Sequence, residues 1–182
     1  MKIISAYFSD SDVIPNRYAQ GRASIERVYS NIEWFYQLPP NFPWTIPPKS
    51  DKRYASGLFR IWYLSQHPDT MWMDWDCVVH REIKLPETDR PVFGEYLGSH
   101  DTFLIYNGKN TQFFKTLCDI YASEIRGTNW DHEGWIQWVM NGRFKNDIVL
   151  LPQVDYKHTS YTVYGDIAPA DDYIVKKHQL RG

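Results

Sequence analysis

The chain has 182 residues, of which 43% are hydrophobic and 16% aromatic, and its formal net charge at pH 7 is −2. This length and apolar content predict one domain over residues 1–182, with a C-terminal tail from about residue 165, and exclude a disordered chain. The near-neutral charge excludes a general electrostatic attraction to nucleic acid or anionic membrane, and no apolar run is long enough to span a bilayer. The two cysteines have no metal-type spacing, which fits a reducing, cytoplasmic location.

The N-terminal half predicts strands and helices in the order strand, helix, helix, strand. Residues 2–8 form an apolar run that predicts a buried first strand. Apolar side chains at helical spacing predict a helix over about residues 17–38, followed by a rigid proline-rich loop over 39–48. A second apolar stripe predicts a helix over about residues 50–68. The apolar run at 70–79 predicts another buried strand.

The C-terminal half continues the alternation of strands and helices. Its predicted elements are strands at 92–97, 102–106 and 148–151, a helix at 111–125, and a short helix around 135–140 that Asp131 would cap. The remainder is expected to be loops and a tail. Together the elements predict an α/β fold with a single central, mixed and mostly parallel sheet flanked by helices.

Two aspartates interrupt the apolar run at residues 70–79, which reads Thr-Met-Trp-Met-Asp-Trp-Asp-Cys-Val-Val. A buried carboxylate is costly unless it is paired or binds a metal. Because side chains two residues apart on a strand leave the same face, a strand here would aim Asp74 and Asp76 at one point. Two hard oxygen donors suit Mg²⁺ or Mn²⁺ that keeps open positions for a phosphate ligand. The sequence therefore predicts a metal site, with a pair of solvated loop aspartates as the alternative.

The segment around these aspartates carries a family resemblance. It contains Ser-Gly-Leu-Phe-Arg-Ile-Trp-Tyr-Leu over residues 56–64 and His-Pro-Asp over 67–69, followed by the aspartate run. It resembles the sugar-binding region of DXD glycosyltransferases, in particular the family of yeast outer-chain mannosyltransferases and clostridial glucosylating toxins. In that family a helix with Ser-Asp-x-x-Arg precedes a strand ending Tyr-x-Asp-x-Asp. Arg60 thus occupies the arginine position, Gly57 replaces the aspartate, and Asp51 is the candidate for the missing carboxylate.

The resemblance implies a compact GT-A-like nucleotide-binding fold and assigns roles to further residues. Asp76 would ligate the metal, and Asp74 would contact it through water or bind ribose and sugar hydroxyls. Arg60 would meet the phosphates or the donor sugar as a charge-assisted hydrogen-bond donor. The remaining candidates are Tyr7, Asn107 and Ser160 for donor binding, His158 as a late metal ligand, and Asp131 and Glu133 for acid/base work near the acceptor.

Three of these residues have a simpler alternative when they are read without the family. Arg60 also fits a salt bridge on a helix surface, and Asp131 also fits a helix cap. His158 also fits an ordinary loop histidine whose hydrogen bonds are satisfied locally.

The function implied is a metal-dependent glycosyltransferase that uses a nucleoside diphosphate sugar, with retention of configuration favoured by the resemblance. Transfer builds negative charge on the departing diphosphate, so Mn²⁺ or Mg²⁺ and an arginine at the phosphates would stabilise the leaving group. The acceptor stays open among a glycan, a small molecule, a protein and modified nucleic acid. The last is included because a basic stretch contains Lys49, Lys52 and Arg53.

Two other functions stay open at this point. Nucleotidyl or phosphoryl transfer also uses paired aspartates on metal, although the sequence lacks a glycine-rich phosphate loop. A non-catalytic nucleotide-sugar binding module is the second, and Gly57 in place of the family aspartate supports it. Glycoside hydrolysis fits less well, because its two carboxylates flank the scissile bond from opposing sides.

Overall fold

Six strands form a mixed sheet in the computed structural model, which describes residues 1–8, 16–46, 52–75, 77–79, 81–96, 99–132, 134–151 and 174–176. Across the sheet the order is β2 (Ile32–Phe35), β1 (Lys2–Ala6), β3 (Thr70–Met73), β6 (Ser99–Tyr106), β5 (Val92–Tyr96) and β7 (Val149–Leu150). Strand β1 is parallel to β2 and β3, and β5 is parallel to β7, whereas β6 is antiparallel to both of its neighbours. The expected mixed, mostly parallel sheet is confirmed.

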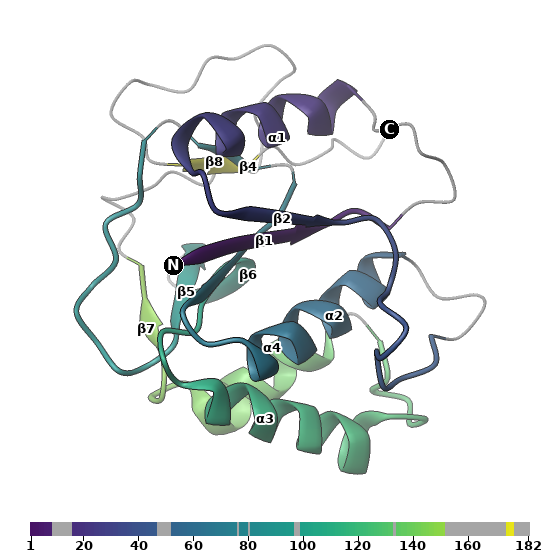
Figure 1. Ribbon diagram of the computed structural model, residues 1–182. Helices are drawn as coiled ribbons and strands as arrows, with labels where there is room; N and C mark the ends of the chain where they lie inside the picture. Colours follow the sequence, from purple (N-terminus) through teal and green to yellow (C-terminus); the bar gives the residue numbers. More distant parts are fainter. Residues whose placement is uncertain are drawn as a thin grey trace.

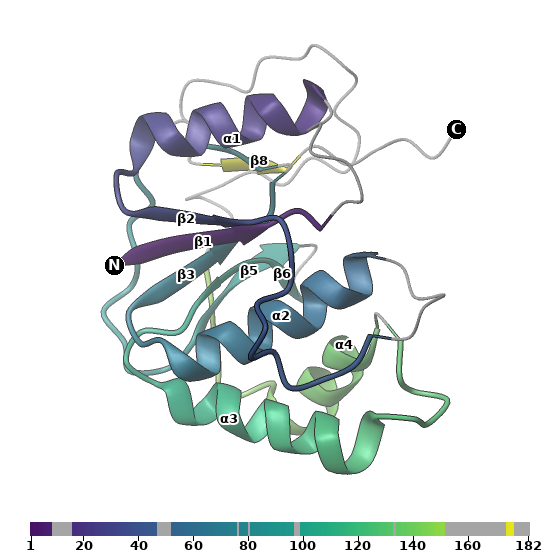
Figure 2. The same ribbon diagram turned by 45° about the vertical axis from the view of Figure 1, so that its right-hand side comes forward.

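Helices cover both faces of this sheet (Figures 1 and 2). On one face, α1 (Asn16–Val28) lies beside a small antiparallel pair made of β4 (Cys77–Val79) and β8 (Ile174–Lys176). The other face carries α2 (Lys52–Gln66), α3 (Thr111–Ile120) and α4 (Trp135–Val139). The last two continue as π-helical turns, η1 (Tyr121–Ile125) and η2 (Met140–Phe144). Among the described helices, none combines the length and apolar character needed to cross a bilayer.

The side chains of the inner strands alternate between two hydrophobic cores. Ile3, Met71 and Met73 belong to the core that includes Ile25 of α1. The intervening positions point to the opposite face, where Ile4 and Trp72 pack with residues of α2 and α3. This period of two places every second residue of β3 under α2, so the residue that follows Met73 also faces α2.

Three parts of the sequence prediction are wrong. The helix expected over residues 17–38 ends at Val28, and residues 32–35 form β2 because they pair with β1 at the edge of the sheet. The strand expected over residues 70–79 is two strands, β3 and β4, which belong to different sheets. The region expected to be a loop and tail contributes β8, which pairs with β4.

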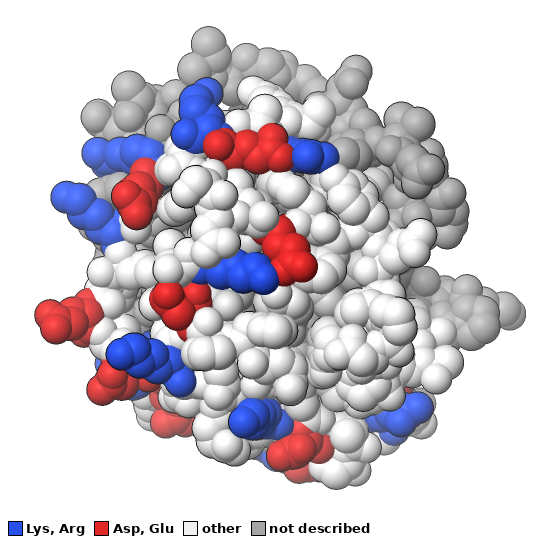
Figure 3. Space-filling model, viewed as in Figure 1, with Lys and Arg blue, Asp and Glu red and all other residues white. Residues whose placement is uncertain are grey.

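The charged side chains of the described residues are interspersed on the face shown in Figure 3. Basic and acidic groups lie next to each other, and some form ion pairs, such as Lys2 with Glu33 and Arg22 with Glu26. This mixture agrees with the net charge of −2 and gives this face no field of one sign that would attract a polyanion.

Candidate functional site

The candidate site begins where β3 ends, at Asp74. The backbone N–H of Asp74 donates to the carbonyl of Phe103 on β6 at 2.8 Å, which continues the sheet pairing by one residue. The Asp74 carbonyl then accepts from the N–H of Cys77 at 3.1 Å and closes a four-residue turn. The strand geometry expected for both aspartates therefore stops at Asp74, because the chain turns here into β4. Asp76 lies outside the described residues.

Arg60 of α2 and Trp72 of β3 hold the Asp74 side chain. The indole Nε1–H of Trp72 donates to Asp74 Oδ1 at 2.7 Å, and Arg60 Nη1 lies 3.5 Å from the same oxygen. The Arg60 guanidinium is 4.7 Å from the Trp72 ring centroid and donates to the carbonyl of Thr102 on β6. The side chains of Arg60 and Asp74 are only 10% and 18% exposed. A charge pair at this depth is screened far less than a surface pair.

One polar atom of this cluster has no partner within the described part of the chain. Arg60 Nε is buried and makes no hydrogen bond there. A buried donor without a partner is expensive, and such atoms concentrate where a ligand completes the set. The structure thus brings together Arg60 and Asp74, two of the residues predicted for donor binding, and leaves one arginine donor unused beside them.

An aromatic cluster surrounds Trp75, the residue between the two aspartates. Its ring centroid lies 4.8 Å from that of Trp34, 5.4 Å from that of Tyr7 and 5.7 Å from that of Tyr36. Trp75 is 3% exposed, and its Nε1 has no hydrogen-bond partner among the described residues. Tyr7, predicted to bind the donor, therefore lies against the aspartate turn, and the cluster fixes the turn through its central residue.

Helix α1 supports the turn from the other face of the sheet. Gly21 packs so closely that a Cβ built there would meet the carbonyl of Trp75 and lie 2.8 Å from the carbonyl of Cys77. Ser24 adds two hydrogen bonds, because its Oγ donates to the Gly21 carbonyl at 2.7 Å and accepts from the Val79 N–H at 2.8 Å. The turn is thus clamped between α1 and the Arg60 side chain of α2.

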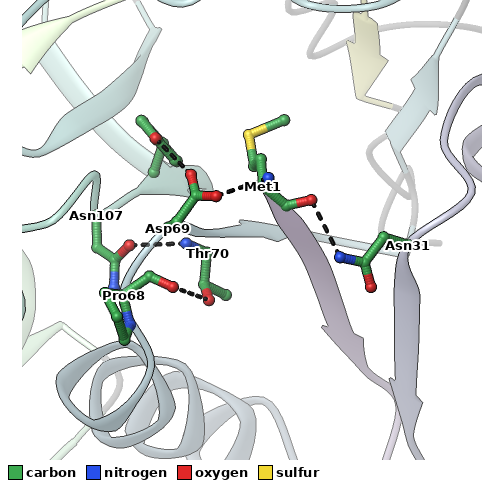
Figure 4. Close-up of polar contacts among 7 residues, drawn as sticks. Met1, Asn31, Pro68, Asp69, Thr70 and Asn107 are labelled. Carbon is green, nitrogen blue, oxygen red and sulfur yellow. Dashed lines mark hydrogen bonds and ion pairs between the residues drawn. The ribbon is translucent and has the colours of Figure 1, made fainter.

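Asn107 lies at the opposite end of β3, roughly 13 Å along the strand from Asp74 at 3.3 Å per residue. Its side chain is fully buried and its amide hydrogen bonds are local (Figure 4). The Oδ1 accepts from the Thr70 N–H at 2.9 Å, and the Nδ2 donates to the carbonyls of Leu64 at 2.8 Å and His67 at 2.7 Å. The structure does not bring Asn107 to the other predicted donor residues, and its contacts join the end of α2 to the start of β3.

Asp131 lies in the loop between η1 and α4 and accepts three hydrogen bonds. Its Oδ1 accepts from the hydroxyls of Tyr54 and, at 3.1 Å, Tyr121, and its Oδ2 accepts from the Gly127 N–H at 2.7 Å. Burial raises the pKa of Tyr121 to about 12, so this hydroxyl stays protonated and can donate at neutral pH. Asp131 does not cap α4, whose N-cap is Gly134 without a side-chain hydrogen bond. Its contacts instead attach the loop to α2 and η1.

Several predicted site residues lie outside the described part of the chain, and their roles stay predictions. They are Asp51, Asp76, Glu133, His158 and Ser160. Within the described residues, no group of three or more His, Cys, Asp or Glu side chains is arranged to hold a metal ion. At the turn, the carboxylate of Asp74 is the one that belongs to the described residues.

Sequence reasoning missed the aromatic cluster around Trp75 and the two tyrosines on Asp131. The cluster combines the end of β1 with β2, a strand that was predicted as helix, so its members could not be brought together. Residues 32–35 read Ile-Glu-Trp-Phe, and their alternation breaks at Trp34 and Phe35, so the local pattern did not distinguish a strand from a helix.

Comparisons with known proteins identify the fold. No protein-family model matches the sequence, and no curated protein matches it. Among solved structures, the chain is similar to a glycosyltransferase involved in glycosylation of the major capsid of PBCV-1, with 12% identity, a TM-score of 0.57, and coverage of 96% of this chain and 92% of that one. An active-site mutant of LgtC gives 13% identity and a TM-score of 0.56, covering 99% and 88%.

A third similar structure is the apo form of the glycosyltransferase GlyE from Streptococcus pneumoniae TIGR4, with 13% identity and a TM-score of 0.52. The match covers 84% of this chain but 45% of GlyE, so this chain corresponds to about half of that protein. At these identities the likeness establishes the fold alone. The chain has the α/β fold of GT-A glycosyltransferases, as expected from the sequence.

Proposed function

We propose that this protein transfers a sugar from a nucleoside diphosphate sugar to an acceptor, with Mn²⁺ or Mg²⁺ at the aspartate turn. The observation that carries the proposal is the contact of Arg60 and Asp74 at the carboxyl end of β3. In open α/β sheets, ligands bind at the carboxyl ends of the strands. The GT-A fold adds support, because the protein structures it resembles are glycosyltransferases.

The carboxylates of the aspartate turn fit a divalent cation when Asp76 is included. Asp74 Oδ1 already accepts from Trp72 and faces the Arg60 cation, so this oxygen suits a contact through water or with sugar hydroxyls better than direct ligation. Asp76, two residues later, would supply the direct carboxylate ligand. A bound cation would neutralise the diphosphate and stabilise the negative charge that develops as the sugar departs.

Arg60 contributes a fixed positive charge to the same place. Its guanidinium is held over Trp72 and against the Thr102 carbonyl, so it does not have to reorganise when charge develops nearby. The N–H at Arg60 Nε, which has no partner among the described residues, can donate to an oxygen of the sugar nucleotide. Preorganised donors of this kind favour the transition state because their ordering is completed during folding.

The aromatic cluster adds a supporting surface at the same edge. Tyr7, the residue after β1, is half-buried, and its ring packs against Trp75. Its exposed part is available to the sugar nucleotide, while the ring is held in place. Ser160, Asp51 and His158 are further donor or metal contacts in this proposal, and Glu133 is the acid/base candidate near the acceptor. For Asp131 we propose a positioning role, because three hydrogen bonds already occupy its carboxylate.

The direct test is release of the nucleoside diphosphate from a panel of UDP- and GDP-sugars with Mn²⁺, since many transferases slowly hydrolyse their donor. We expect one sugar nucleotide to be turned over by the wild type and not by Asp76→Asn. An exposed control, Arg143→Ala, should retain turnover. Equal release by wild type and Asp76→Asn would contradict the assignment of the turn as the reactive site.

A non-catalytic donor-binding module is the second candidate, and Gly57 favours it. This glycine stands three residues before Arg60 on α2, where the similar family carries an aspartate. Binding of a nucleotide sugar with no turnover of any donor in the panel would select this candidate over the transferase.

A further inference from the structure

Trp130 and Trp138 are the two exposed tryptophans of the chain. Their side chains are 47% and 43% exposed, whereas the other six are buried or half-buried. Their rings are stacked, with centroids 5.1 Å apart and planes 20° from parallel. Large aromatic rings rarely remain in water together unless they contact something else. The pair therefore requires an explanation that packing within the fold does not supply.

The framework beneath the pair is ordered by specific contacts. Trp130 lies in the loop that Asp131 attaches to Tyr54 and Tyr121, and its backbone N–H donates to Thr128 Oγ1 at 3.1 Å. Trp138 lies on α4, which is anchored by the buried side chains of Trp135, Ile136 and Val139. Two different elements thus present their rings in parallel. Such preorganisation reduces the entropy that a ligand would lose on binding.

A chain of contacts links the pair to the Arg60 and Asp74 site. Gln137, beside Trp138, donates through Nε2 to the carbonyl of His100 on β6 at 3.3 Å. Two residues further along β6, roughly 7 Å away, the Thr102 carbonyl accepts from Arg60. From the loop side, Asp131 contacts Tyr54, which shares α2 with Arg60. Both tryptophans therefore lie on segments that contact α2 and β6, two of the elements that build the proposed donor site.

We propose that Trp130 and Trp138 form a stacking platform for a sugar ring of the acceptor, which makes the acceptor a glycan; this rests on the proposed function. A pyranose presents a flat apolar face of C–H groups and a rim of hydroxyls. Because the two rings stack on each other, a pyranose would meet an outer ring face of the pair, and the exposed polar residues Asn129, His132 and Asn141 are close to it in the sequence. His132 Nδ1 accepts from the Gly134 N–H at 3.0 Å, which leaves Nε2–H as a donor for a hydroxyl.

Two other occupants fit less well. Single-stranded nucleic acid stacks on aromatic rings, but it also requires a groove of unpaired cations, and the exposed Arg143 of η2, the turn that continues α4, is already paired with Glu124. The net charge of −2 gives no further attraction to a polyanion. A second copy of the chain would require about 800 Å² from each partner, far more than two tryptophan rings provide.

The test uses the indole N–H signals of the ¹⁵N-tryptophan-labelled protein in NMR spectra. Trp130→Phe and Trp138→Phe assign the two signals, and the probes are cello-, manno-, galacto- and chito-pentaose at millimolar concentration. We expect one oligosaccharide to shift these two signals selectively. Trp130→Ala and Trp138→Ala should each weaken its binding by about threefold to tenfold, the range for losing one aromatic stacking contact. Arg143→Ala should bind it as the wild type does.

The outcomes that overturn the platform are specific. No shift with any of the four oligosaccharides, or equal binding by the alanine variants, would exclude a glycan at this surface. Shifts with a short oligothymidylate instead would assign it to nucleic acid, and shifts that grow with protein concentration alone would assign it to self-association. Mn²⁺-dependent UDP or GDP binding, measured on the same sample, separates a failure of the platform from a failure of the proposed function.

Discussion

Strand β3 has an aspartate at each end, and the two differ in what surrounds them. Asp69 precedes the strand, is 50% exposed, and pairs with the amino group of Met1 at 2.7 Å and the hydroxyl of Tyr106 at 2.8 Å (Figure 4). Asp74 follows the strand and is 18% exposed between Arg60 and Trp72. The contacts of Asp69 are partly exposed to water, whereas Asp74 belongs to a buried charge pair whose Arg60 Nε has no partner among the described residues.

The difference sets a carboxylate with exposed structural contacts apart from the one that we propose to be functional. The contact with the amino group of Met1 lowers the pKa of Asp69, and water around it screens the interaction. At Asp74 the charge pair is desolvated, and the turn that follows is clamped by α1 and α2. This buried pair is the feature that our proposal assigns to the donor site.

The largest effect should come from removing Asp74. Asp74→Ala leaves the Arg60 guanidinium buried without its carboxylate, and we expect a loss of about 3 kcal/mol in the free energy of unfolding. Asp69→Ala, at the exposed end, should cost less than about 1 kcal/mol. Urea denaturation of both variants measures the difference. Equal losses would mean that the two ends of β3 are energetically alike and would break the comparison.

Removing the arginine tests the same pair from the other side. Arg60→Ala should slow donor turnover by about tenfold to a thousandfold, because a preorganised charge beside the phosphates is lost. Arg60→Lys should recover part of the rate, since it keeps the charge without the planar fork. Arg143→Ala is the matched control on an exposed ion pair. Rates for Arg60→Ala within twofold of wild type would leave this arginine a purely structural role.

Two helix glycines sharpen the role of α1. Gly21→Ala forces a methyl group against the carbonyls of Trp75 and Cys77, and we expect it to destabilise the fold by about 1–3 kcal/mol. Gly57→Ala on α2 meets no atom within 4 Å and should stabilise by about 0.5–1 kcal/mol, because alanine favours the helix. Thermal unfolding distinguishes opposite signs. A stabilised Gly21→Ala would show that α1 does not press on the turn.

The smallest effect concerns Gly57, at which the proposed family resemblance would place an aspartate. Gly57→Asp introduces that carboxylate in open space, three residues before Arg60 on the same helix. We expect severalfold tighter donor binding, measured by calorimetry beside Gly57→Asn as the uncharged control. If aspartate and asparagine act alike, the charge is not used at this position.

Much of the architecture follows from local patterns in the sequence. The apolar stripe of α2 and the period of two in β3 correctly predicted that Arg60 lies on a helix preceding the strand of Asp74. The helix over residues 17–38 was wrong after Val28, because the apolar spacing of Ile32 and Phe35 also fits a helix. Only pairing with β1 selects the strand there, and that pairing is a long-range interaction.

The site was less predictable because its contacts join distant segments. The turn at residues 74–77 contains no glycine or proline, and its aspartates, which also favour turns, were interpreted as metal ligands on a strand. Asn107 was expected near the donor, yet the antiparallel direction of β6 carries it to the other end of β3. The exposure of Trp130 and Trp138 likewise depends on how α4 packs, which no local pattern predicts.

The central claim is that the carboxyl end of β3 is a metal-dependent donor site. Isothermal titration of UDP and GDP into the protein, with Mn²⁺ and then with EDTA, tests it most directly. We predict binding of one nucleotide with Mn²⁺, loss of that binding with EDTA, and the same loss in Asp76→Asn with Mn²⁺ present. Equal affinity with and without the metal, or wild-type affinity in Asp76→Asn, would contradict the account.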